Sequence, residues 1–160
     1  MVKRMNFGLV FYMGIAITII VALPTCNQSG SNYHEDLKSA LHAEYKAHME
    51  KNALALVTTF SDSFVSVDRG RIGFPGREES LKRFESYFDK VNFIEWGDVT
   101  PPVIRFSNDK SLAYVIVRKQ VILEIKSNPG TYDTTHFAWT GIYRQENKTW
   151  KLECITSTNE

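Results

Sequence analysis

The stretch SLAYVIVRKQVILEIK, residues 111–126, decides the predicted fold of this chain. It stays rich in aliphatic and β-branched residues for its whole length, whereas a mean strand has about five or six residues. Runs of this composition that are bounded by turn residues are typical of β-strands. The stretch therefore predicts one unusually long strand.

Further predicted strands flank this stretch. Four more segments have β-rich composition: residues 93–100, 103–107, 134–145 and 150–158. Residues 128–130 read Asn-Pro-Gly, which is a turn signal between two of these strands. Pro101 and Pro102 mark a bend or an edge, because proline cannot donate a ladder hydrogen bond. The C-terminal half is therefore predicted to be strands in hairpin succession.

The part of the chain before these strands has helical periodicity. One face carries residues at spacings of three and four: Leu37, Leu41, Tyr45, His48, Asn52 and Leu56. Asn52 indicates a break, so residues 33–60 are predicted to form one long helix and a shorter one. Residues 64–68 alternate apolar and polar side chains, which predicts a short strand. A third helix is predicted to begin near Arg77, with two glutamates in its first turn.

Helices gathered at one end and antiparallel strands at the other predict an α+β fold. Three segments carry a resemblance to a known family: YKAHMEKNALALVTTFSDSFVSVD, GREESLKRFESYF and WKLECITST. The chain resembles the NTF2-like (SnoaL-like) superfamily over residues 33–160. This resemblance implies a cone, in which a strongly bent antiparallel β-sheet packs on three N-terminal helices and leaves one open pocket. The long strand of residues 111–126 fits a sheet that curls along its length.

The resemblance also implies which elements line the pocket: the first helix, the first strand and the concave face of the long strands. The residues of this chain on those elements are Tyr45, His48, Asp68, His136, Trp139 and Thr156. Successive side chains of a strand point to opposite faces. Either His136 with Ala138 or Phe137 with Trp139 therefore faces the pocket, and the sequence leaves this choice open.

The expected function is the binding of a small, largely apolar ligand in this pocket. The alternative is a small-molecule isomerase, dehydratase or hydrolase that uses Asp68 or His136 as its acid or base. Ketosteroid isomerases share the fold and pair a tyrosine on the first helix with an aspartate base on the first strand. Tyr45 and Asp68 occupy matching elements. An apolar pocket would raise the pKa of such an aspartate towards that of a useful base.

Two features depart from the isomerase pattern. The chain has no match for the second, protonated carboxylic acid of the oxyanion hole, and Thr156 stands where some relatives place a histidine. Asp68 could instead be a turn acceptor or a partner of Arg71, and Tyr45 and His48 could be core residues. A further alternative is a non-catalytic module that forms a homodimer through its outer sheet face, as many relatives do.

Residues 1–25 have the layout of a secretory signal, with two basic residues followed by an uncharged apolar run. The tetrapeptide LPTC at residues 23–26 resembles the lipobox of bacterial lipoproteins. This resemblance implies that Cys26 is lipidated and holds the protein on a membrane of the bacterial cell envelope, facing the periplasm or the exterior. An uncleaved membrane helix is the alternative, because the run is just long enough to span a bilayer. Residues 26–32 would form a polar tether.

The composition excludes some classes of partner. The chain has 160 residues, of which 43% are hydrophobic and 23% charged, and its formal net charge is +1. This balance gives no electrostatic basis for nucleic-acid binding. The sequence has no zinc-like cysteine cluster, no Gly-rich phosphate loop and no histidine pair at a metal-ligand spacing. Neither a metal nor a cofactor is expected.

Overall fold

The computed structural model describes residues 32–159, so the predicted signal segment and Cys26 lie outside the described residues. The helices are α1 (Tyr33–Met49), α2 (Ala53–Thr58) and α3 (Arg77–Phe88). The strands are β1 (Phe60–Asp68), β2 (Arg71–Gly73), β3 (Val91–Asp98), β4 (Val103–Phe106), β5 (Leu112–Ile125), β6 (Tyr132–Glu146) and β7 (Thr149–Asn159). The predicted α+β class is confirmed, and the stretch that decided it forms β5.

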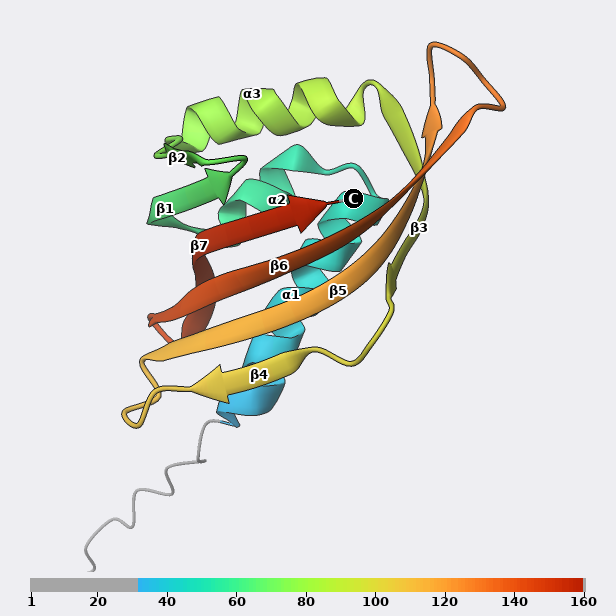
Figure 1. Cartoon of the computed structure of the whole chain (residues 1–160). Helices are drawn as coiled ribbons and strands as arrows, with labels where there is room; N and C mark the ends of the chain where they lie inside the picture. Colours follow the sequence, from blue (N-terminus) through green and yellow to red (C-terminus); the bar gives the residue numbers. More distant parts are fainter. Residues whose placement is uncertain (1–31, 160) are drawn as a thin grey trace, which may run out of the picture. The chain divides into compact units, whose positions relative to one another are not determined.

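The strands form a single open sheet in the order β2-β1-β7-β6-β5-β3, with β4 also paired to β5. The expectation of an antiparallel sheet needs one correction, because β1 runs parallel to β7 and the sheet is mixed. The first and last strands of the domain thus lie side by side, as Figure 1 shows. Sequence order does not reveal such a pairing, since only strands joined by a short turn are constrained to be antiparallel neighbours.

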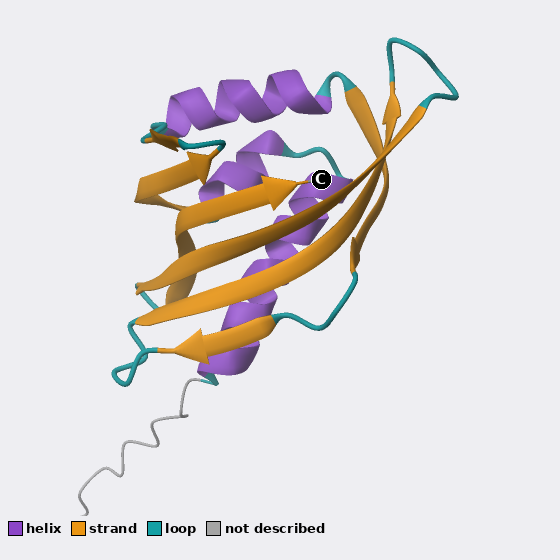
Figure 2. Cartoon of the chain, viewed as in Figure 1, coloured by secondary structure: helices purple, strands orange, loops and turns teal. Residues whose placement is uncertain are grey.

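The sheet is strongly bent, and its two longest strands carry most of the bend. Paired along almost their whole length, β5 and β6 sweep across the domain as a twisted ribbon (Figures 1 and 2). The register shifts by a residue in β3 between Phe93 and Glu95, and in β7 between Leu152 and Cys154, opposite Tyr143 and Ile142 of β6. Such irregularities bend a strand and increase its local twist. The sheet consequently has a concave face, which the helices cover.

Helix boundaries follow from local capping. The side chain of Asn52 accepts a hydrogen bond from the Ala55 amide at 2.9 Å and caps α2, so the break predicted at Asn52 is the start of a new helix. The core between helices and sheet is built from large buried side chains: Leu37, Leu56, Val57, Val115, Val121, Tyr143 and Trp150. Of the helices formed by the described residues, none has both the length and the apolar character that crossing a bilayer requires.

Candidate functional site

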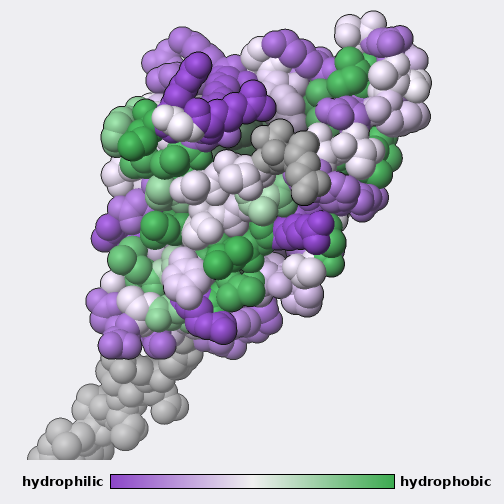
Figure 3. Space-filling model, in the orientation of Figure 1, coloured by the Kyte–Doolittle hydropathy of each residue, from purple (hydrophilic) through white to green (hydrophobic). Residues whose placement is uncertain are grey.

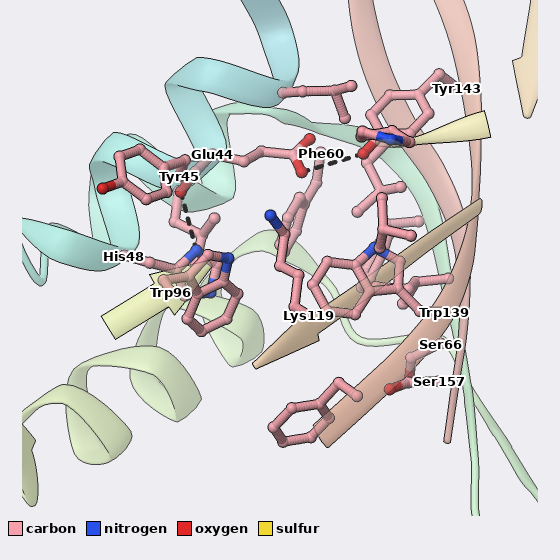
Figure 4. A pocket seen from close by; sticks show the side chains of 18 of the residues that line it. Glu44, Tyr45, His48, Phe60, Ser66, Trp96, Lys119, Trp139, Tyr143 and Ser157 are labelled. Atoms are coloured by element: carbon pink, nitrogen blue, oxygen red, sulfur yellow. Dashed lines mark hydrogen bonds between the residues drawn. The ribbon is translucent and has the colours of Figure 1, made fainter. Parts of the chain in front are cut away.

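A cavity of about 1060 Å³ lies between the concave face of the sheet and the helices. The exposed area of its walls is mainly apolar, and aromatic side chains are prominent in it: Phe60, Phe64, Phe84, Tyr87, Trp96, Phe137, Trp139 and Tyr143. Charged side chains occur among them, and Figure 4 shows three polar residues, Glu44, His48 and Lys119, converging from α1 and β5. The cavity is therefore an apolar hollow with one polar end, which we call the polar floor and define by Glu44, His48, Lys119 and Tyr143.

Strand alternation explains which side chains reach the cavity. On β5 the residues at odd positions from Ala113 to Val117 are buried, while Tyr114 and Ile116 are exposed on the outer face. Lys119 continues the inward-facing series, which places a lysine among the apolar side chains of the concave face.

Glu44 is the buried acid of this floor. The hydroxyl of Tyr143 donates a hydrogen bond to its Oε2 atom at 3.1 Å, and its Oε1 atom is buried with no hydrogen-bond partner among the described residues. Burial raises the pKa of Glu44 to about 8, against the smaller opposing effects of the Tyr143 hydrogen bond and the Lys119 charge. Glu44 is therefore predominantly a neutral carboxylic acid at pH 7.

Tyr143 reinforces this state. Burial, followed by the proximity of Glu44, raises the pKa of the phenol well above its usual value. The phenol consequently stays protonated and acts as a donor towards Glu44. The side chain comes from β6, where Tyr143 pairs with Leu152 of β7 next to the register shift of that pairing.

His48 lies one helical turn after Glu44 and is neutral. Its Nδ1 atom is 2.9 Å from the backbone carbonyl oxygen of Glu44. Because a carbonyl oxygen can only accept, Nδ1 carries the hydrogen and Nε2 keeps its lone pair. Burial lowers the pKa of His48 to about 4. The ring stacks on Trp96 with centroids 4.1 Å apart, so aromatic packing also fixes its orientation.

The positive charge of Lys119 lowers the pKa of both Glu44 and His48. Its ammonium group forms an ion pair with Asp98 on β3 and lies 5.9 Å from the centroid of the Trp139 ring. Only 12% of the Lys119 side chain is exposed, whereas 38% of Asp98 is. The polar floor therefore combines a neutral acid, a neutral imidazole and a paired ammonium.

Two of the residues expected from the sequence lie at the rim of the cavity. Tyr45 is 39% exposed, and its ring stacks on His42 with centroids 6.0 Å apart. The Asp68 side chain is 51% exposed and its carboxylate lies 3.9 Å from Nε of Arg69. The enzymatic hypothesis required a buried Asp68, so its exposure removes the base on which an isomerase-like mechanism depended.

The strand parity left open by the sequence is now decided. Phe137 and Trp139 line the cavity, so His136 and Ala138 face the other side of β6. His136 Nε2 is 3.2 Å from Oε1 of Gln120, its neighbour on β5. The expectation of an acid or base at His136 therefore needs correction, because this side chain does not reach a ligand in the cavity.

The last strand follows the same rule. Ile155 and Ser157 line the cavity, while Thr156 between them is exposed on the opposite face. The expectation that Thr156 contacts the ligand needs correction for this reason. His48 and Trp139 are the expected ligand-contact residues that the structure brings into the cavity wall.

Glu44 and Lys119 were not predicted, although the sequence carries a signal for each. Glu44 falls on the apolar face of α1, because the spacings Leu37–Leu41–Glu44–His48 are four, three and four. The spacings Leu41–Tyr45–His48 are four and three, so the same periodicity also fits Tyr45 as the inward-facing residue. Lys119 lies in register with the buried odd positions of β5. A charged residue on an apolar face is the informative exception in both elements.

A metal site finds no support in the part of the chain that is described. Within residues 32–159, no three His, Cys, Asp or Glu side chains come together in a way that could hold a metal ion.

No family model matches the sequence, and no curated protein matches it. Solved structures do match its fold. A ketosteroid isomerase-like protein from Erwinia carotovora atroseptica has a TM-score of 0.63 at 17% identity, covering 78% of this chain and 94% of that one. An NTF2-like protein from Cytophaga hutchinsonii has a TM-score of 0.65 at 13% identity, covering 81% and 99%.

A provisionally assigned dehydratase from the NTF2-like family, from Streptomyces avermitilis, has a TM-score of 0.63 at 16% identity, covering 77% of this chain and 92% of that one. At such identities the likeness concerns the fold alone. It supports the NTF2-like fold expected from the sequence, and it leaves the chemistry of the cavity to be argued from this chain's own residues.

The raised pKa of Glu44 predicts an unusual pH dependence of stability. Between the ordinary pKa of 4.5 and about 8, the unfolded chain releases a proton that the folded chain keeps. The free energy of unfolding contributed by Glu44 therefore falls as the pH rises through this window, by roughly 3–5 kcal/mol in total. Glu44→Gln should remove this slope and be more stable than the wild type above about pH 8.

Urea unfolding of both proteins at several pH values measures the effect. Glu50→Gln is the matched control, because Glu50 is exposed next to the end of the same helix and its carboxylate pairs with Lys46 at 3.7 Å. His48 contributes an opposite slope, present in all three proteins, because its lowered pKa favours the folded state at higher pH. Parallel wild-type and Glu44→Gln profiles would show that Glu44 is not buried as a neutral acid.

Proposed function

We propose that this domain binds a small, largely apolar molecule in its cavity. The observation that supports the proposal is the cavity itself, about 1060 Å³ with mainly apolar walls that include many aromatic side chains. Ligand sites are typically about 300–1,000 Å³, mainly apolar, with a few polar groups that orient the ligand. This cavity has that composition, because the polar floor gathers Glu44, His48 and Lys119 at one end of an aromatic chamber.

The comparisons support binding in a cavity of this fold without defining a reaction. Two of the similar proteins are described as ketosteroid isomerase-like and as a provisional dehydratase. The isomerase-type hypothesis for this chain relied on Asp68, whose side chain is half-exposed and next to Arg69. We therefore propose ligand binding and not catalysis by Asp68.

Filling the cavity should block binding. Ser157 lines the cavity from β7, so Ser157→Trp should place an indole in the space that the ligand needs. We expect the affinity for ethylnaphthalene, an apolar probe without a polar group, to fall on the order of tenfold or more, which corresponds to at least about 1.4 kcal/mol. Equilibrium dialysis measures this affinity.

Thr156→Trp is the matched control, since Thr156 is the next residue on the same strand and faces the opposite side. It should bind the probe as the wild type does. If ethylnaphthalene does not bind the wild-type domain at all, or if both tryptophan variants bind it equally well, the cavity is not a site for apolar ligands.

We further propose that the protein is held at the bacterial cell envelope through a lipid on Cys26. The support is the order of basic residues, apolar run and LPTC tetrapeptide in the sequence. Cys26→Ser should abolish incorporation of labelled palmitate and release the protein from the membrane fraction. Cys154→Ser is the control, because Cys154 lies in β7 of the folded domain and should leave labelling unchanged. Labelling that survives Cys26→Ser would contradict the anchor.

We also propose that two copies pair through the outer face of the sheet. An apolar patch on this face is formed by Val103, Tyr114, Ile116 and Ile142, each between 39% and 44% exposed. Val103 is opposite Ile116 in the register of β4 and β5, and Tyr114 is opposite Ile142 in that of β5 and β6. In Figure 3 green atoms lie among white and purple ones on this face, and an apolar patch with a polar surround is typical of an interface between two copies.

Light scattering should then give a dimer for the wild type and a monomer for Ile116→Lys. The control is Leu54→Lys, which places the same charge on an exposed apolar residue of α2, away from the patch. A monomeric wild type at about 100 μM would rule out a stable pair, since such interfaces have dissociation constants well below this concentration.

A further inference from the structure

The polar floor contains a hydrogen-bonding capacity that the domain itself does not use. Glu44 Oε2 receives the Tyr143 hydroxyl at 3.1 Å, but the buried Oε1 atom has no partner among the described residues. The great majority of buried polar atoms have a hydrogen-bond partner, so a buried oxygen without one needs an explanation. Glu44 lines the cavity, which makes a ligand a natural partner for this oxygen.

The geometry also indicates what kind of partner fits. A buried carboxylate with a single neutral donor would be strongly disfavoured, so the carboxyl keeps its proton. Oε2 already accepts the hydrogen of Tyr143, which leaves Oε1 as the oxygen that carries the proton and donates. The terminal torsion of a glutamate is broad, so the carboxyl can turn to present this donor to a bound molecule.

The other charged and titratable groups around Glu44 also determine which ligand groups the floor can bind. Lys119 brings a second set of donors from β5, and its partner Asp98 on β3 is the more exposed member of the ion pair. Tyr143 on β6 is a neutral donor that is already engaged. His48 on α1 is neutral and packed against Trp96. Among the described residues, the floor therefore offers a ligand the Glu44 carboxyl and the Lys119 ammonium as donors, and this ammonium is paired with Asp98, which also lines the cavity.

We propose that the floor selects molecules whose apolar body ends in an acceptor oxygen, a carbonyl or carboxylate that binds Glu44 and Lys119. This inference rests on the proposed function, because it concerns the same cavity and names the class of ligand. An aliphatic or aromatic hydrocarbon forms no hydrogen bond with Glu44 or Lys119, so the floor does not increase its affinity. An ammonium ligand is rejected, since it meets the Lys119 charge and a carboxyl whose accessible oxygen donates.

Four probes with the same aromatic body separate these possibilities: ethylnaphthalene, methyl naphthyl ketone, naphthoate and naphthylethylamine. At about pH 6.5, the ketone should bind about tenfold tighter than the hydrocarbon, the value of one net hydrogen bond. The amine should bind more weakly than the hydrocarbon. The ketone and naphthoate arms then show whether a neutral carbonyl or an anionic carboxylate is preferred, and Lys119→Met should weaken naphthoate more than the ketone.

A second set of measurements assigns the donor to Glu44. At about pH 9.5 the wild-type carboxyl ionises and the preference for the ketone over the hydrocarbon should fall at least about threefold. Glu44→Gln supplies an amide donor that does not ionise, so its preference should be independent of pH. Glu44→Leu should lose most of the preference for the ketone, because only the Lys119 donor remains. Glu50→Gln, outside the cavity, should reproduce the wild-type pH dependence.

The outcomes distinguish this inference from the proposed function. If ethylnaphthalene binds but neither oxygen-bearing probe binds tighter, or if the amine binds tightest, selection of an acceptor oxygen is wrong while the apolar cavity stands. If the ketone preference survives unchanged at about pH 9.5 in the wild type, Glu44 is not the donor. If none of the four probes binds, the proposed function fails and this inference fails with it.

Discussion

The pairing of β5 with β6 is the constraint on which the rest of the domain depends. These strands stay in register from Leu112 opposite Arg144 to Glu124 opposite Tyr132. A strand pair of this length accumulates the right-handed twist of each residue and does not remain flat. The sheet therefore curls along its length, with its concave face towards the helices. The hollow that remains is too wide for the core side chains to close, and it becomes the cavity of about 1060 Å³.

The chemistry of this cavity follows from how little water reaches its floor. Glu44 and His48 are carried on one face of α1 and covered by the sheet, so burial acts on both. The same desolvation moves their pKa values in opposite directions, because it favours the neutral form of an acid and of a base alike. The acid and the imidazole of the floor are thus uncharged at neutral pH, while Lys119 is paired to Asp98.

For this protein, likeness of fold does not establish likeness of function. Structures at 13–17% identity reproduce the NTF2-like fold over most of the chain. Similar scaffolds host different chemistries, since the side chains that line the cavity can change while the bent sheet is kept. Here Asp68 is half-exposed and His136 faces away from the cavity, so neither residue is placed as an isomerase-like mechanism requires. The buried pair of Glu44 and Tyr143 is instead the basis of the proposed recognition of a polar group on an apolar ligand.

Local sequence determined the elements of this domain. Periodicity, turn residues and caps are properties of neighbouring residues, so the long strand, the helix break at Asn52 and the α+β class could be predicted without coordinates. They did not reveal that β1 lies parallel to β7, because strands distant in the chain pair through contacts that no local pattern records.

Only the tertiary structure decided the site. Strand parity has two solutions that differ by one residue, and the folded structure turns Phe137 and Trp139, and not His136, towards the cavity. The helical periodicity of α1 has the same one-residue uncertainty, and for this reason Tyr45 was predicted to face the cavity and Glu44 was not. A pKa depends on how much water and which charges surround a group, and these neighbours come from α1, β3, β5 and β6 together. The sequence thus determined which elements form, while three-dimensional packing determined which side chains meet and how they ionise.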